Sequence, residues 1–165
     1  MKTIDDLKAA FAGESQANRK YTAFSRKADE EGYHQIARLF RAAAHAETVH
    51  ALNHFKALDE IKDTALNLQA AIAGEHYEVV TMYPDFIKDA EDEQNKKATN
   101  SFKWAWEAEK GHESLYTKAL ESLSSMKEEK FDYYVCPVCG HTHERNAPEK
   151  CPVCGTPGRK FEKIS

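Results

Sequence analysis

Two copies of the motif Glu-x-x-His, Glu47 to His50 and Glu109 to His112, could carry metal chemistry. On a helix, residues three positions apart share a face, with Cβ atoms about 5–6 Å apart. Each motif can therefore offer a carboxylate and an imidazole to one point. Both groups are ligands for divalent transition metals such as iron.

Two further glutamates precede the motifs at matching distances. Glu14 lies 33 residues before Glu47, and Glu75 lies 34 residues before Glu109, which indicates an internal repeat of two helical hairpins. One Glu from each of two helices plus Glu-x-x-His from each of two others is the ligand set of ferritin-like di-iron and di-manganese bundles. The repeat therefore predicts a di-metal site.

One residue breaks the symmetry of this repeat. Glu78 stands three residues after Glu75, whereas Ala17 stands three residues after Glu14. The extra carboxylate adds negative charge, which favours ferric iron. The predicted metal ligands, which are also the predicted catalytic residues, are Glu14, Glu47, His50, Glu75, Glu78, Glu109 and His112.

Four long helices must position these side chains, over about residues 3–32, 34–60, from Thr64 onward and 95–124; Pro84 should bend or interrupt the third. In each helix the apolar stripe that faces the core is interrupted near its middle by Glu or His. A single glutamate on a helix is usually solvated. Five carboxylates at a similar depth are different, because burying them unpaired is costly or forces protonation. Two metal ions would supply the compensating charge.

The four cysteines form a second candidate metal site. They occur as two Cys-Pro-Val-Cys-Gly copies, namely Cys136, Cys139, Cys151 and Cys154. This spacing predicts one tetrahedral four-thiolate site, for which iron and zinc are almost equally suitable. A structural zinc ribbon is the simpler interpretation, but a redox di-metal site needs an electron donor, which favours iron.

Composition limits the possible functions. The chain has 165 residues, 30% of them charged, and a net charge of −4, so it offers no basic surface for nucleic acid. No apolar run reaches the roughly 20 residues needed to span a membrane. The charged start does not fit a signal peptide, and clustered cysteines suit metal ligation in a reducing compartment. We therefore expect a cytoplasmic protein.

The ligand segments resemble those of rubrerythrins. The resemblance rests on residues 12–15 (AGES), 46–50 (AETVH), 74–78 (GEHYE), 108–112 (AEKGH) and the tail from Tyr134 to Phe161. It implies a mainly α fold, with a ferritin-like four-helix bundle over 1–125, a linker over 126–132 and a rubredoxin-like domain over 133–165. In one departure, His141 occupies a position after the first cysteine-pair glycine that is usually aromatic in rubredoxin-like domains.

The resemblance also implies an activity. Rubrerythrins reduce hydrogen peroxide to water at a di-iron site, with electrons relayed by the rubredoxin-like iron from an external donor such as a rubredoxin or an NAD(P)H-dependent reductase. In that family His50 and Glu78 would be alternative ligands of one iron, used in the reduced and oxidised states. Tyr21 and Tyr83 would place hydroxyl groups near the cluster; otherwise each is an ordinary core aromatic residue.

Two geometric considerations predict a homodimer. The linker near residue 124 lies roughly 18 Å along the last helix from His112, so the tail should sit far from its own di-iron site. In rubrerythrins a head-to-tail dimer overcomes this separation. In addition, a ferritin-like crossover must return about 30 Å, and residues 60–64 reach at most about 18 Å. The bundle is therefore a plain up-down-up-down one, or helix pairs are exchanged between two chains; we hypothesise the exchange.

Two other functions fit parts of the pattern. Similar bundles oxidise and store iron, although storage needs no thiolate centre. A non-enzymatic metal-binding module with structural zinc in the tail is the other alternative.

Overall fold

The computed structural model describes residues 1–165, which form two compact units, Met1–Lys62 and Asp63–Ser165. The order of elements is a series of helices followed by a small sheet, so the predicted mainly α class is confirmed. None of the helices combines the length and the apolar character that crossing a membrane requires.

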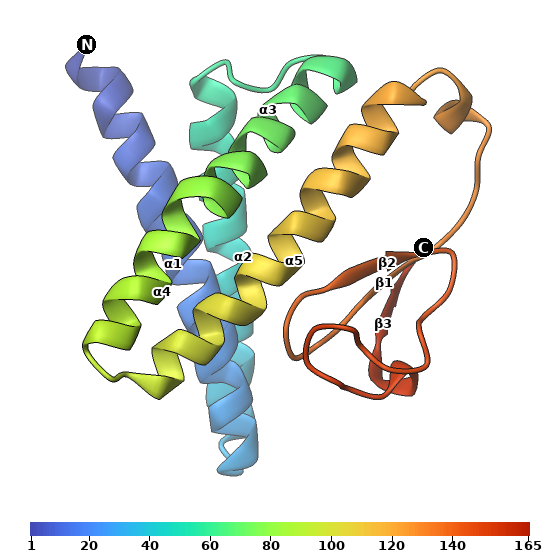
Figure 1. The fold of residues 1–165 in the computed structure, drawn as a ribbon. Coiled ribbons are helices and arrows are strands. Elements are labelled where there is room, and N and C mark those ends of the chain that lie inside the picture. Colours follow the sequence, from blue (N-terminus) through green and yellow to red (C-terminus); the bar gives the residue numbers. More distant parts are fainter. The chain divides into compact units, whose positions relative to one another are not determined.

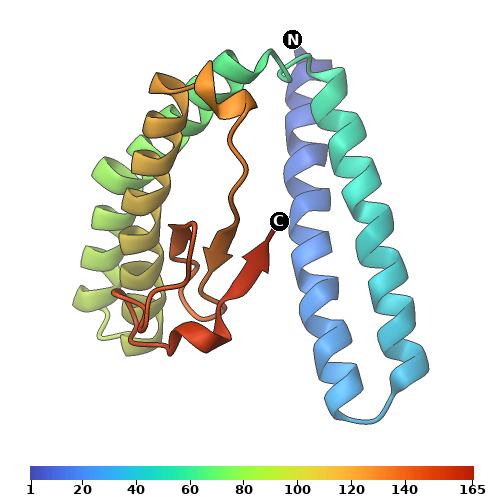
Figure 2. The same cartoon turned by 90° about the vertical axis from the view of Figure 1, so that its right-hand side faces the viewer.

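The first unit is a helical hairpin of α1 (Lys2–Glu30) and α2 (His34–Ala57), seen side by side in Figure 2. Gly32 follows the end of α1, at the predicted boundary of the first helix, and its φ of +83° places it in the left-handed region that favours glycine. The turn is closed by the Tyr33 N–H, which donates to the Ala28 carbonyl at 2.8 Å. Small side chains on α2 lie buried at intervals of seven residues, which lets the two backbones pack closely: Ala37, Ala44 and Ala51.

The second unit contains α3 (Thr64–Tyr77), a π-helical turn η1 (Glu78–Met82), α4 (Tyr83–Asp92) and α5 (Lys96–Glu121). Both α3 and α4 pack along α5. The N-cap of α3 is Asp63, whose carboxylate accepts a hydrogen bond from the Leu66 N–H at 2.9 Å. Thr64 is therefore the first helical residue, where the third helix was predicted to start.

The interruption expected at Pro84 takes the form of the π-helical turn just before it. In this turn backbone bonds reach back five residues, as the Tyr83 N–H does to the Glu78 carbonyl. The next N–H in the series would belong to Pro84, which has none, so the Val79 carbonyl lacks a backbone donor. The Trp106 indole N–H on α5 replaces it and donates to Val79 O at 2.7 Å.

The cysteine-rich segment follows a short 3-10 turn, η2 (Ser125–Lys127). It forms an antiparallel sheet in the order β2-β1-β3, with β1 at Tyr133–Val135, β2 at Thr142–Glu144 and β3 at Glu162–Ile164, and a 3-10 turn η3 (Gly158–Lys160) before β3. After α5 the chain folds back, so that β2 contacts α5 (Figure 1). Lys118 on α5 forms an ion pair with Glu144 on β2.

Replacing Trp106 tests this account of the π-helical turn. Trp106→Phe keeps an aromatic ring but leaves the Val79 carbonyl without a donor, which should lower the free energy of unfolding by about 1–3 kcal/mol in urea titrations. Trp104→Phe, at an exposed position on the same helix, should change it by less than about 0.5 kcal/mol. Adding Pro84→Ala to Trp106→Phe should recover part of the loss, since alanine restores an N–H; equal losses for Trp104 and Trp106 would contradict the account.

Candidate metal centres

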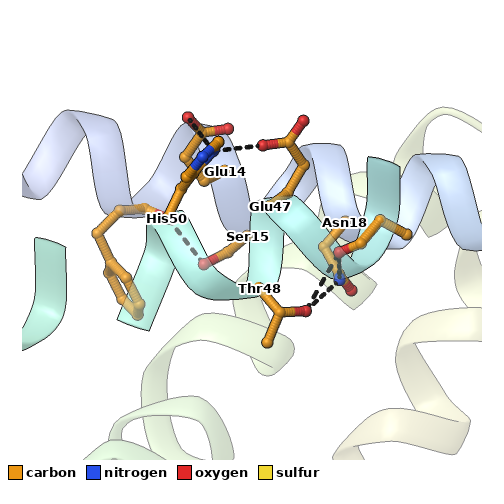
Figure 3. Close-up of polar contacts among 8 residues, drawn as sticks. Glu14, Ser15, Asn18, Glu47, Thr48 and His50 are labelled. Carbon is orange, nitrogen blue, oxygen red and sulfur yellow. Dashed lines mark hydrogen bonds and ion pairs between the residues drawn. The ribbon is translucent and has the colours of Figure 1, made fainter. Parts of the chain in front are cut away.

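The first unit brings together three of the predicted ligands, Glu14 from α1 and Glu47 and His50 from α2 (Figure 3). Their ligand atoms all lie within 4.8 Å of one another. His50 Nδ1 is 2.8 Å from Glu47 Oε2 and 3.7 Å from Glu14 Oε1. About half of the His50 side chain is exposed, so the group lies on a face of the hairpin.

A polar contact next to this group fixes the register of the two helices. The Asn18 amide on α1 donates to the Ala44 carbonyl and to the Thr48 hydroxyl on α2 (Figure 3). Asn18 follows Glu14 by one helical turn, and Thr48 adjoins Glu47. The contact therefore holds the two carboxylates at the same depth along the hairpin.

The second unit repeats this arrangement with Glu75 from α3 and Glu109 and His112 from α5. These ligand atoms also lie within 4.8 Å of one another. His112 Nδ1 is 2.6 Å from Glu109 Oε2 and 4.0 Å from Glu75 Oε1. The other carboxylate oxygen of Glu75, Oε2, is buried without a hydrogen-bond partner. A buried carboxylate oxygen of this kind requires a cation or a proton.

The charges in the second group are strongly coupled. Burial, together with the hydrogen bond and the charge of Glu109, raises the pKa of Glu75 to about 7. Burial opposes ionisation of Glu109 as well, but its contact with His112 prevails and lowers the Glu109 pKa. The hydrogen bond to Glu109 in turn raises the pKa of His112. Without metal, the group thus holds protons that a bound cation would displace.

Glu78, the asymmetric carboxylate, lies near the second group but not among its three ligands. It is the first residue of the π-helical turn, one turn after Glu75. Burial and the charge of Glu109 raise its pKa. Glu78 is therefore close enough to interact with the Glu109 charge, although it is not one of the three grouped ligands.

The predicted tyrosines have different surroundings. Burial and the charges of nearby carboxylates, chiefly Glu109, raise the pKa of Tyr83, so its hydroxyl stays protonated beside the second group. Tyr21 packs in an aromatic cluster with Phe24 and Phe40. Sequence reasoning gave no site role to Tyr116. Burial and the charges of Glu75 and Glu109 raise its pKa as well. Its position one turn after His112 on the same stripe was the available signal.

The four cysteines form the expected thiolate cluster, and none is in a disulfide. Cys136 Sγ lies 3.6 Å from Cys154 Sγ, and Cys139 Sγ lies 3.4 Å from Cys151 Sγ. Four thiolates about 2.3 Å from a tetrahedral ion would be about 3.8 Å apart, so the cluster fits a metal after a small expansion.

The two cysteine knuckles are built alike. In each, the residue after the second cysteine is a glycine with φ near +80°, Gly140 or Gly155, whose N–H donates to the carbonyl of the first cysteine. Although burial acts in the opposite direction, hydrogen bonds that involve Thr156 help to lower the pKa of Cys154 to about 6. Burial raises the pKa of Cys139.

The expectation that the tail lies far from the ligands of its own last helix was wrong. The Thr142 hydroxyl on β2 lies 2.9 Å from His112 Nε2 on α5. The distance of roughly 18 Å was counted along α5 from His112 to the linker, whereas the chain after η2 runs back along the helix.

A mainly helical chain with two such carboxylate–histidine groups and a four-cysteine cluster defines a di-iron protein of the ferritin-like class with a rubredoxin-like domain. Comparison with known proteins agrees. The rubrerythrin family matches residues 5–120, and the rubredoxin-like domain of rubrerythrins matches residues 134–162. The chain belongs to the rubrerythrin family, which confirms the predicted resemblance and fold class.

Individual relatives extend over most of the chain. Nigerythrin of Nitratidesulfovibrio vulgaris is 40% identical, covering 96% of this chain and 85% of its own length. Rubrerythrin-2 of Clostridium acetobutylicum is 37% identical, covering 97% and 95%. A solved structure of nigerythrin in its fully reduced, all-ferrous state matches with a TM-score of 0.61 and 38% identity, covering 98% of this chain and 86% of that one. These matches support iron as the metal of the carboxylate–histidine and four-cysteine sites. They also support an oxidoreductase with a function of peroxide-reductase type.

The raised pKa of Glu75 predicts a pH-dependent effect of Glu75→Gln. An unfolded glutamate has a pKa of about 4.3, whereas folded Glu75 titrates at about 7. Between these values only the folded state holds the proton, so the metal-free protein loses stability as pH rises, and the loss is complete above pH 7. Metal-free Glu75→Gln should therefore unfold at higher denaturant than wild type at pH 8, but not at pH 4.

Added ferrous iron should reverse this order, because the amide is a poorer ligand than the carboxylate. Glu107→Gln, on the exposed face of α5, serves as the control and should show no pH-dependent difference from wild type. A Glu75→Gln protein that is less stable than wild type at pH 8 without metal would contradict the assignment.

Proposed function

We propose that this protein reduces hydrogen peroxide to water at a di-iron site fed by its four-cysteine iron. The observation that carries the proposal is the contact between the two kinds of centre. A residue of the cysteine-rich domain, Thr142, touches His112, a member of the second carboxylate–histidine group. An electron-transfer domain in contact with a metal ligand suits a redox enzyme better than a storage protein.

The two carboxylate–histidine groups fit two iron ions, provided that both groups contribute to one site. Each contributes two carboxylates and one imidazole, which alone leave a metal incompletely ligated. Together they make the six-residue set of ferritin-like di-iron sites, and Glu78 adds a seventh. The buried Glu75 Oε2, which has no hydrogen-bond partner, is the atom most in need of such a cation.

Two bound ferrous ions would supply the two electrons that, with two protons, convert one hydrogen peroxide into two waters. Two side chains beside the ligands contribute a proton and a negative charge to this site. Tyr83 is protonated at neutral pH like any tyrosine, and burial with the nearby carboxylates raises its pKa further, so it can donate a hydrogen bond beside the site. Glu78 lies beside the group as an additional carboxylate available in the oxidised state, the role that the family resemblance gives it.

Metal content and a single peroxide addition test the proposal. The purified protein should contain three irons per chain and, once reduced without oxygen, should return to its coloured oxidised form when peroxide is added. Glu109→Gln should slow that oxidation by at least the roughly 10–100-fold that is typical of residues that only orient a ligand, because Glu109 is itself a ligand, while Glu107→Gln should not change it. Zinc in the cysteine site with no colour, or iron accumulation in a multi-subunit shell without peroxide reduction, would favour one of the alternatives and contradict the proposal.

We further propose a homodimer in which helical hairpins are exchanged. Only residues 58–63 connect α2 to α3. A ferritin-like crossover would have to return about 30 Å, counted from Glu47 to Ala57 and from Thr64 to Glu75, whereas six residues reach at most about 21 Å. The α1–α2 hairpin of one chain would then complete the site with α3 and α5 of its partner. An external reductase or rubredoxin remains the proposed electron source.

Mixing two inactive variants distinguishes exchange from its absence. Glu14→Ala damages the first group and Glu109→Ala the second. In an exchanged mixed dimer, one site carries both substitutions and the other carries neither, so refolding the two variants together should restore peroxide reduction that neither shows alone. If the mixture stays as inactive as its components although mixed dimers form, the exchange does not occur.

A further inference from the structure

The two nitrogens of His112 face different partners. Nδ1 lies 2.6 Å from Glu109 Oε2, inside the ligand group. Nε2 points away from the group, toward the Thr142 hydroxyl at 2.9 Å. A metal bound among these carboxylates would therefore use Nδ1, and a neutral imidazole would then keep its proton on Nε2.

The direction of the hydrogen bonds at Thr142 follows from this proton. The hydroxyl has one hydrogen, and it lies 3.2 Å from the Gly140 carbonyl, which can only accept. Thr142 thus donates to Gly140 O and accepts from His112 Nε2–H. Gly140 directly follows Cys139, and its own N–H donates to the Cys136 carbonyl. A continuous chain of hydrogen bonds therefore runs from a di-iron ligand to the first cysteine knuckle.

The docking of β2 on α5 holds Thr142 in place. Thr142 and Glu144 are two residues apart on a strand and so point to the same side. Glu144 forms an ion pair with Lys118, about a turn and a half beyond His112 on α5. On the other side of Thr142, the His141 ring lies against Gly111, where an added Cβ would be 3.8 Å from His141 Nδ1. These contacts on either side fix the strand against the helix.

We propose that Thr142 is a positioning residue that couples the two metal centres. Its hydroxyl orients His112 so that Nδ1 faces the di-iron site, and it connects that ligand to the cysteine knuckle. The coupling rests on the proposed function. With iron in both sites, each transfer would oxidise the four-cysteine iron from ferrous to ferric and reduce one ferric ion of the di-iron site to ferrous. No bond would break, and the proton on His112 Nε2 would stay in its hydrogen bond to Thr142.

Two substitutions separate the hydroxyl from the shape of the side chain. Thr142→Val keeps the branched shape and removes both hydrogen bonds, whereas Thr142→Ser keeps the hydroxyl. The first readout is Co²⁺ binding to full-length protein that holds zinc in its cysteine site and whose carboxylate site has been emptied with a chelator. Affinity should fall about 10–100-fold in Thr142→Val and stay near wild type in Thr142→Ser, as expected for a group that orients a metal-bound histidine.

The second readout is electron transfer in the iron-loaded protein. After anaerobic reduction and addition of peroxide, the colour of the oxidised four-cysteine iron should return about 10–100-fold more slowly in Thr142→Val, and at nearly the wild-type rate in Thr142→Ser. If Thr142→Val matches wild type in either measurement, or if Thr142→Ser is as impaired as Thr142→Val, the proposal is wrong.

The two readouts also separate this inference from the proposed function. If peroxide fails to oxidise even the wild-type protein, the proposed function is wrong. The Co²⁺ comparison needs no peroxide and no iron, so it still decides whether Thr142 orients His112.

Discussion

Carboxylates brought within a few ångströms of one another repel unless a cation or a proton lies among them. Each unit of this chain makes such an arrangement from two glutamates and a histidine, whose ligand atoms lie within 4.8 Å. In the second unit the cost of this repulsion appears in the pKa of Glu75, which burial and Glu109 raise to about 7. The helices hold these groups together, with the register of α1 and α2 fixed by Asn18. A pair of metal ions is the most direct means of neutralising them.

The arrangement also explains why the repeat is conspicuous in sequence. Both hairpins place a Glu on the first helix opposite Glu-x-x-His on the second, so each offers half of the six-residue ligand set known from ferritin-like di-iron sites. The cysteine knuckles repeat on a smaller scale, each with a left-handed glycine that directs its N–H back to the first cysteine carbonyl. The contact through Thr142 adds what neither repeat contains, a connection between the two kinds of centre.

The ligand groups could be predicted from sequence because helical periodicity places residues three apart on one face. Glu14, Glu47 and His50 lie together as that reasoning required, as do Glu75, Glu109 and His112. The π-helical turn was visible only as a proline, since its form depends on Trp106, 22 residues after Pro84 in the sequence, satisfying the Val79 carbonyl. The return of the tail along α5 could not be foreseen, because a polar linker does not encode a direction. Docking depends instead on long-range pairs such as Lys118 with Glu144.

Anomalous diffraction at the iron edge from crystals of the iron-loaded protein tests the central claim most directly. It should show two neighbouring irons, each bound by residues of both carboxylate–histidine groups, and a third iron among the four cysteine sulfurs. Side chains of Glu14, Glu47, Glu75 and Glu109 that point into solvent, with no iron beside them, would contradict the account.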